Sequence, residues 1–246
     1  MSVAILTYHS LDESDSVISV APHVFASQMQ SLAQAGIRVV ALEEVPRLLQ
    51  SGECAVALTF DDGFRNLRDH AATVLARHGF PATVFLVPAH CGRDNGWGTQ
   101  PAGVACQPLL DWDEIKTLHA AGVRFGAHSL SHAYLTKLPA AAAEAEMVDS
   151  KRAIEAVLGD TVDTFAYPYG ACDLRVRALA QRHFRIACGV RLGYAGRQSD
   201  PMELERLDMY YWRNQPDLSN LFAPRTRAYV GVRASLRAAR RLLTRY

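Results

Sequence analysis

The chain of 246 residues is long enough to bury a large core within one α/β domain. Its 26 Lys and Arg residues balance 25 Asp and Glu residues, so no strong field attracts a polyanion and we do not expect nucleic acid as a partner. The five cysteines are odd in number and form no Cys-x-x-Cys pair, which argues against a disulfide framework or a thiolate zinc site and favours a reducing compartment.

The chain starts with a short apolar run, residues 3–8, that breaks at Tyr8-His9 and has no basic segment before it. We interpret this run as a strand and not as a secretory signal. No later stretch reaches the roughly 18 apolar residues that a membrane span needs. The sequence therefore predicts a soluble, cytoplasmic protein.

Farther along, apolar β-branched runs alternate with helical patterns. The predicted strands are 3–8, 37–42, 54–60, 81–87, 123–129, 164–170 and 185–190, and the predicted helices are 23–36, 42–52, 64–79, 112–122, 140–159 and 173–184. Repeated βα units imply a parallel sheet, and about seven of them in this length favour closure into a distorted (β/α) barrel over an open sheet. We predict a single barrel domain, residues 1–222, followed by a basic helical tail, residues 223–246.

Three polar motifs follow predicted strands, at the edge where such folds carry their chemistry. In the first, the adjacent carboxylates Asp61 and Asp62 precede Gly63, and burying them without a positive partner is costly. In the second, "HSLSH", the side chains of His128 and His132 project to one side if the segment coils into a helical turn. Two imidazoles and one carboxylate are a typical divalent-metal set, which leaves the second carboxylate to act as a base.

Each motif also has a plainer interpretation. Adjacent aspartates before a glycine often form a turn or a helix cap, and a His-x-x-x-His pair is often two surface histidines. The third motif, "YPYG" at residues 167–170, reads as ordinary strand aromatics before a turn. Only the combination at successive strand ends favours a catalytic site.

In this order and at these separations, "TFDDG", "HSLSH" and "FAYPYG" resemble the polysaccharide deacetylase family, carbohydrate esterase family four, from about residue 3 to residue 208. The resemblance implies that Asp61 is the general base. It also implies that a divalent metal, most often zinc with cobalt, nickel or manganese as alternatives, is held by Asp62, His128 and His132. The implied reaction removes an N-acetyl group from a sugar and releases acetate.

The resemblance gives the third motif a role as well. Attack on an acetamide builds an oxyanion that needs hydrogen-bond donors. Pro168 stiffens the chain and leaves the Tyr169 backbone N–H free to hold that oxyanion, as the family does. Many members carry an Arg before this motif to orient the base, but Thr164, Phe165 and Ala166 stand here, so the partner that orients the base is unidentified.

Many members of the family carry the histidine that acts as general acid late in the chain, whereas the candidate here stands near the N-terminus. His9 follows the first strand in a Tyr-His pair, and this resembles a subgroup of poly-N-acetylglucosamine deacetylases with the acid motif at the front. We assign His9 as the acid that protonates the leaving amine. The alternative is a strand-end histidine that stabilises a loop.

Two tryptophans are candidates for substrate contact, together with Pro168 of the third motif. "LLDWDEI" resembles the fourth motif of the family, in which Trp112 walls the acetyl pocket and Asp113 orients a catalytic partner; it reads equally well as a helix start. Trp97 lies in a Gly- and Pro-rich stretch, residues 88–108, which we interpret as a lip over the site, with a mobile insertion as the alternative.

From Pro224 onward the chain carries seven arginines and no acidic residue. The pattern predicts a helix with its arginines on one side and Leu236 and Leu243 on another. Such a helix either docks on the barrel or makes peripheral contact with an anionic membrane, here the inner membrane.

The expected substrate is an N-acetylhexosamine-containing glycan or a lipid-linked glycan precursor, as in exopolysaccharide biosynthesis. Three alternatives remain open. One is an amide hydrolase that acts on a small non-carbohydrate substrate with the same scaffold, and the second is a non-catalytic glycan-binding relative. The third is an iron oxygenase with a His-His-carboxylate triad, although its usual scaffold is all-β.

Overall fold

The computed structural model describes residues 2–100 and 104–243, with side chains as far as residue 240. Its strands are all parallel and form one sheet in the order β1-β8-β7-β6-β5-β4-β3-β2. They are β1 Val3–Tyr8, β2 Val39–Val40, β3 Ala55–Phe60, β4 Ala82–Leu86, β5 Arg124–Ala127, β6 Thr164–Ala166, β7 Ile186–Leu192 and β8 Leu204–Asp208.

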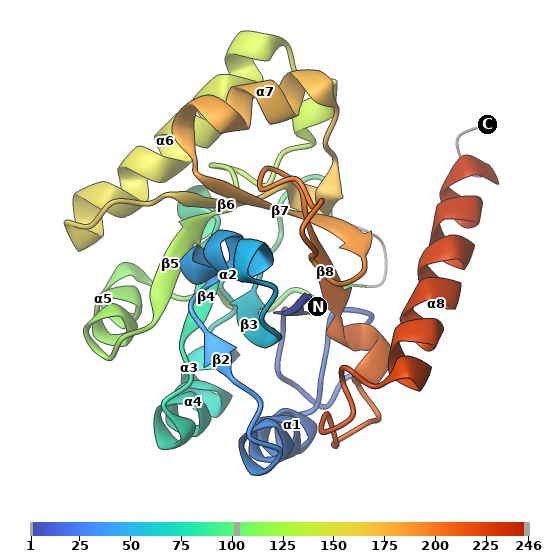
Figure 1. Cartoon of the computed structure of the whole chain (residues 1–246). Helices are drawn as coiled ribbons and strands as arrows, with labels where there is room; N and C mark the ends of the chain where they lie inside the picture. The colour runs from blue at the N-terminus through green and yellow to red at the C-terminus, as the bar shows by residue number, and fades with distance from the viewer. Residues whose placement is uncertain (1, 101–103, 244–246) are drawn as a thin grey trace.

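The sheet closes because β1 pairs with β8 on one side and with β3 on the other (Figure 1). Seven strands therefore form a barrel, and the short β2 pairs only with the first half of β3. This confirms the predicted (β/α) barrel of about seven units in a single domain. The sequence patterns missed β8, which the barrel needs for closure.

Helices connect the strands and cover the barrel. They are α1 Pro22–Gln34, α2 Val45–Ser51, α3 Asn66–His70, α4 Ala72–His78, α5 Trp112–Ala120, α6 Ala140–Leu158, α7 Leu174–His183 and α8 Pro224–Leu243. Their ends follow local chemistry. The Asp111 side chain caps the start of α5 by accepting hydrogen bonds from the Asp113 and Glu114 N–H groups, and the Glu114 side chain accepts one from the Asp111 N–H. Helices α2, α4 and α6 each end at a glycine with a left-handed backbone.

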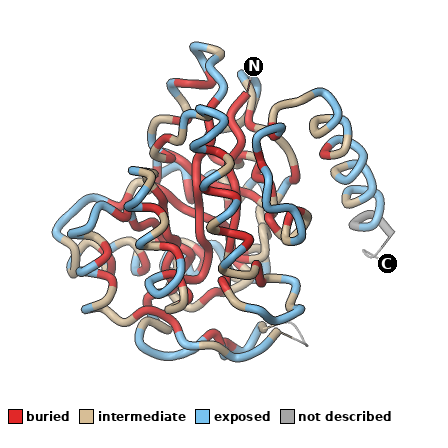
Figure 2. Tube along the Cα trace, turned by 90° about the horizontal axis from the view of Figure 1, so that it is seen from below, coloured by how far each residue is buried: buried red, intermediate tan, exposed pale blue. Residues whose placement is uncertain are grey.

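The core lies inside the barrel and between the barrel and its helices (Figure 2). All six residues of β1 and of β3 are buried, as expected for strands covered on both faces. Alternate β1 residues enter different clusters: Ala4, Leu6 and Tyr8 belong to the large cluster that includes the helices, while Val3 and Ile5 belong to the second. This alternation fixes which side chains reach the cavity at the strand ends.

Short 3₁₀ segments shape the rim of the barrel: η1 Leu42–Glu44, η2 Pro88–His90, η3 Leu135–Lys137, η4 Pro168–Gly170 and η5 Met209–Trp212. Helix α8 runs along one flank, and its last turns stand clear of the sheet (Figures 1 and 2). None of the described helices combines the length and the apolar character that crossing a bilayer requires.

Candidate active site

A cavity of about 160 Å³ lies at the carboxyl ends of the strands. The three predicted motifs and the end of β1 converge on it. The polar and aromatic residues that line it include His9, Asp61, Asp62, Trp97, His128, His132, Tyr167, Tyr169, Arg206, Asp208 and Arg237.

The two aspartates reach this cavity through a sharp turn at the end of β3. The Asp61 N–H still bonds to the Tyr8 carbonyl at 2.9 Å and so continues the ladder. Asp62 and Gly63 then adopt left-handed backbones, with φ of 72° and 75°. The positive φ of Gly63 favours glycine, and a Cβ there would lie 2.8 Å from the end of the Leu86 side chain, which would have to move. Both carboxylates thereby face the cavity.

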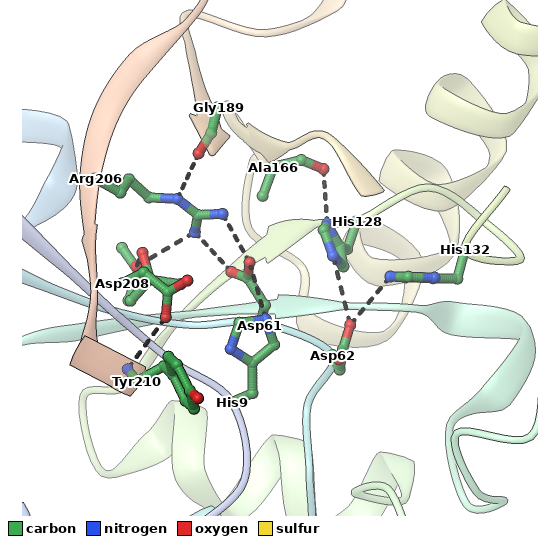
Figure 3. Close-up of polar contacts among 12 residues, drawn as sticks. His9, Asp61, Asp62, His128, His132, Ala166, Gly189, Arg206, Asp208 and Tyr210 are labelled. Carbon is green, nitrogen blue, oxygen red and sulfur yellow. Dashed lines mark hydrogen bonds and ion pairs between the residues drawn. The ribbon is translucent and has the colours of Figure 1, made fainter. Parts of the chain in front are cut away.

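Asp61 is held by Arg206 of β8, which the sequence analysis did not find (Figure 3). Two guanidinium nitrogens donate to its two carboxylate oxygens at 2.7 Å each, and Arg206 Nε donates to the Gly189 carbonyl at 2.9 Å. Both residues are only 3% exposed. Arg206 therefore supplies the orienting partner that residues 164–166 lack.

The pairing also sets the charge of Asp61. Burial by itself would raise the pKa of this carboxyl, but the attraction and hydrogen bonds of Arg206 outweigh it and hold the pKa well below its usual range. Burial would likewise lower the pKa of Arg206, and Asp61 instead raises it. Asp61 is consequently an anion at neutral pH, as a general base must be.

Asp62, His128 and His132 form a buried cluster whose ligand atoms all lie within 4.8 Å of one another. The Nε2 atoms of His128 and His132 lie 3.4 and 3.3 Å from the same Asp62 oxygen, Oδ1 (Figure 3). Within the described residues this oxygen has no hydrogen-bond partner despite its burial.

The chemistry of His128 indicates what belongs in this cluster. Its Nδ1 lies 2.7 Å from the Ala166 carbonyl oxygen, so Nδ1 carries the proton. Burial lowers the pKa of His128 to about 4, so the ring is neutral and its Nε2 presents a lone pair toward the Asp62 carboxylate. Two electron-rich atoms that face each other need a cation between them. The residues present thus fit a divalent metal, with the Ala166 carbonyl orienting one ligand.

His132 is positioned by aromatic neighbours. Its ring stacks on Trp97 with centroids 4.1 Å apart, and Tyr169 packs edge-on at 4.5 Å. Thr99 ties these groups together, because its carbonyl accepts the Tyr169 hydroxyl at 2.9 Å and its own hydroxyl donates to the His132 carbonyl at 3.2 Å. Residues 97–100 therefore cover the cluster where a lip was predicted, while residues 101–103 of that stretch lie outside the described part.

The "YPYG" motif forms η4, in which Tyr169 has a φ of 57°. Gly170 follows with a φ of 62°, and a Cβ there would meet Val190 at 2.0 Å. The Tyr169 ring lines the cavity, whereas Pro168, predicted to contact the substrate, is buried in the turn and lies outside the lining. Tyr167 is buried and donates to the Met202 carbonyl at 2.8 Å, which is a structural role.

His9 lies where the sequence analysis expected it, just after β1 and on the wall of the cavity. Its Nε2 is 3.8 Å from Asp61 Oδ2, and its side chain is partly exposed. Asp208 also lines the cavity and is paired in register with Thr7 of β1. His9 and Asp61 therefore lie side by side on the wall of the same cavity.

Trp112 does not lie where the fourth-motif prediction put it. It opens α5, packs half-buried against the main core cluster and is absent from the residues that line the cavity. Asp113 is 94% exposed and pairs with Lys116 at 3.1 Å. The plainer interpretation, a helix start capped by Asp111, describes this segment, because the apolar indole is buried against the core instead of at the strand ends.

Comparisons with known proteins agree with this geometry. A family model described as polysaccharide deacetylase matches residues 50–184. The chain is 24% identical over 208 residues to YxkH of Bacillus subtilis (strain 168), covering 82% of this chain and 70% of that protein. It is 30% identical over 125 residues to chitin deacetylase 2 of Cryptococcus neoformans var. neoformans serotype D (strain B-3501A), covering 50% of this chain but only 23% of the fungal protein.

The fold itself is shared with solved structures. The Streptococcus pyogenes deacetylase PplD, determined in complex with acetate, superposes with a TM-score of 0.74. The match covers 85% of this chain and 92% of PplD at 23% sequence identity. At that identity the likeness establishes the barrel fold and nothing finer.

Proposed function

Because this chain belongs to the polysaccharide deacetylase family, we propose that it is a metal-dependent hydrolase that removes N-acetyl groups from a carbohydrate and releases acetate. The observation that supports this most strongly is the adjacency of two differently held carboxylates. One buried carboxylate oxygen of Asp62 lies close to the Nε2 atoms of two imidazoles. The carboxylate of Asp61, the next residue, is paired with Arg206. Asp62 is thereby suited to bind a metal ion, and Asp61 is suited to accept a proton.

In this proposal the metal ligands are Asp62, His128 and His132, and zinc is the expected ion. When bound, the ion would polarise the acetamide carbonyl and lower the pKa of a coordinated water. Asp61 accepts the proton of the attacking water, and Arg206 keeps this carboxylate oriented and ionised. The Tyr169 backbone N–H donates to the oxyanion that forms on the acetyl carbon.

His9 completes the reaction by protonating the departing amine. Its partly exposed position beside Asp61 allows it to exchange protons with solvent between turnovers. Trp97 lies over His132 and lines the cavity, so it provides an apolar wall for the acetyl group. The barrel, residues 1–222, then carries these catalytic groups, and the basic tail, residues 223–246, adds Arg237 to the wall of the cavity.

The proposed substrate is a glycan that contains N-acetylhexosamine, either polymeric or lipid-linked. The test is acetate release from a panel of N-acetylated glycans, together with elemental analysis of the purified protein. We expect release that chelator abolishes and added zinc, cobalt, nickel or manganese restores. A protein that neither binds an ion nor releases acetate from any member of the panel would disprove the proposal. Release from small non-carbohydrate amides alone would favour the amide hydrolase.

A further inference from the structure

In the part of the chain that the structure describes, the ring of His9 makes no hydrogen bond that would orient it. Its ion-pair contact is with Asp61, whose Oδ2 lies 3.8 Å from Nε2, beyond hydrogen-bond distance (Figure 3). A group that protonates a leaving amine has to lie within hydrogen-bond reach of that nitrogen. The position of the ring therefore depends on the backbone that carries it, residues 9–20, which we call the first loop.

Asn66, the first residue of α3, binds the first loop directly after His9. Its Oδ1 accepts the Leu11 N–H at 3.1 Å, and its Nδ2 donates to the Ser10 hydroxyl at 2.7 Å. Because the Leu11 N–H can only donate, the orientation of the Asn66 amide is determined. Ser10 and Leu11 are fully buried, so water does not replace these bonds. One side chain thus fixes the two residues that follow the histidine.

Asn66 ends the turn that carries both aspartates, residues 61–66. At the other end of that turn, the Asp61 N–H donates to the Tyr8 carbonyl at 2.9 Å. Tyr8 precedes His9 in the chain, whereas the residues that Asn66 binds follow it. The segment that holds the proposed base therefore also holds the backbone on both sides of the proposed acid.

The rest of the first loop is held by hydrogen bonds to Asp12. Its Oδ2 accepts from the Gln107 amide and the Ser19 hydroxyl, at 2.9 Å each, and from the Ser10 hydroxyl. Its Oδ1 accepts the Ser14 N–H at 2.7 Å. Burial would raise the pKa of Asp12, but the hydrogen bonds outweigh it and lower the pKa to about 2. A charged acceptor, bonded also to the end of the lip, thus anchors the loop.

We propose that Asn66 is a positioning residue that fixes His9 beside Asp61, with Asp12 as a second anchor of the same loop. Asn66 does not line the cavity, so it acts on the reaction only through the backbone of the first loop. The catalytic consequence rests on the proposed function, in which His9 protonates the leaving amine. The fixed position of the His9 ring does not depend on that function.

The test compares two substrates that differ in their need for an acid. An N-acetylglucosamine oligosaccharide has a leaving amine that must be protonated, whereas para-nitrophenyl acetate has a leaving group that needs no proton. Asn66→Ala should lower kcat/KM for the oligosaccharide by about ten- to a hundredfold, because small displacements of a catalytic group are that costly. It should change kcat/KM for the ester by less than about threefold.

Glu155→Ala is the matched control. It also removes a side chain that accepts a backbone N–H, that of Val162 at 2.9 Å, but at the amino end of β6 and away from the cavity. Its kcat/KM should equal that of the parent for both substrates. Equal losses on the two substrates in Asn66→Ala would overturn the proposal.

A double variant shows whether Asn66 acts through His9. In His9→Ala the acid is already missing, so adding Asn66→Ala should cause no further loss on the oligosaccharide. Losses that multiply would overturn the proposal. If Asn66→Ala does not fold, Asp12→Asn, which keeps the size of the side chain, should give a smaller loss that is again confined to the oligosaccharide. A loss on both substrates there would count against the proposal in the same way.

A measurement without substrate separates this proposal from the proposed function. In protein that is isotope-labelled at histidine Cε1, the NMR signal of His9 is identified by its loss in His9→Ala. We expect that signal to shift or broaden in Asn66→Ala and to stay unchanged in Glu155→Ala. An unchanged signal in Asn66→Ala would overturn the positioning role. A parent that releases no acetate, but whose His9 signal responds to Asn66→Ala, would instead disprove the proposed function alone.

Discussion

Replacing Arg206 by Met tests the arrangement on which the proposed base depends. The substitution keeps an unbranched apolar stem but removes the guanidinium, its two 2.7 Å bonds to Asp61 and its 2.9 Å bond to the Gly189 carbonyl. Asp61 then remains 3% exposed without a charge partner. Breaking one side of a buried ion pair costs about 3–5 kcal/mol, and we expect the free energy of unfolding at neutral pH to fall by that amount.

The effect should depend on pH in a defined direction. In the parent, the depressed pKa of Asp61 means that its charge stabilises the fold above the unfolded-state value of about 3.9 and that this contribution is lost as the pH falls. In Arg206→Met, burial acts alone and raises the pKa, so protonation relieves the unpaired charge. The stability difference between the two proteins should therefore be largest near pH 7 and shrink toward pH 4.

Activity should follow the same logic. We expect the acidic limb of the kcat/KM profile to move upward by about two to four pH units, because a loss of about 3–5 kcal/mol corresponds to that shift at about 1.4 kcal/mol per unit. Arg206→Lys keeps the positive charge but cannot make both hydrogen bonds to the Asp61 carboxylate. The acidic limb of its profile should therefore lie between those of the parent and Arg206→Met. Urea unfolding and acetate release at each pH provide both readouts. An unmoved acidic limb together with a stability loss under about 0.5 kcal/mol would refute the positioning role of Arg206.

Three shorter predictions follow from the site. Asp61→Asn should retain the metal ion but lose turnover, whereas Asp62→Asn should lose the metal ion. If elemental analysis finds no metal in Asp61→Asn, Asp61 is a metal ligand and the proposed roles of the two aspartates are wrong. His9→Ala should slow amide cleavage far more than cleavage of an activated acetate ester, whose leaving group needs no proton, and equal rate losses would remove His9 as the acid. Gly170→Ala should lower the free energy of unfolding by about 1–3 kcal/mol, because the residue has a φ of 62° and its new Cβ would meet Val190 at 2.0 Å; an unchanged urea midpoint would contradict this.

The sequence by itself determined the alternating βα pattern and three motifs at strand ends. These features are local: an apolar run, a turn residue and the polar side chains that follow within a few positions. Asp61, Asp62, His128 and His132 could be found in this way because parallel strands deliver their carboxyl ends to one rim whatever their order. His9 was found for the same reason, since it directly follows the first strand.

Only the tertiary structure decided which groups meet across that rim. Arg206 lies 145 residues from Asp61, on a strand that the sequence patterns missed, and it reaches the base because β8 closes the barrel against β1. The orientation of α8 also followed from packing, because Tyr211, Trp212 and Asp208 contact Arg233, Tyr229 and Arg237 on one side of the helix. Strand order and helix rotation depend on contacts between segments far apart in the chain, and no short pattern of residues encodes them.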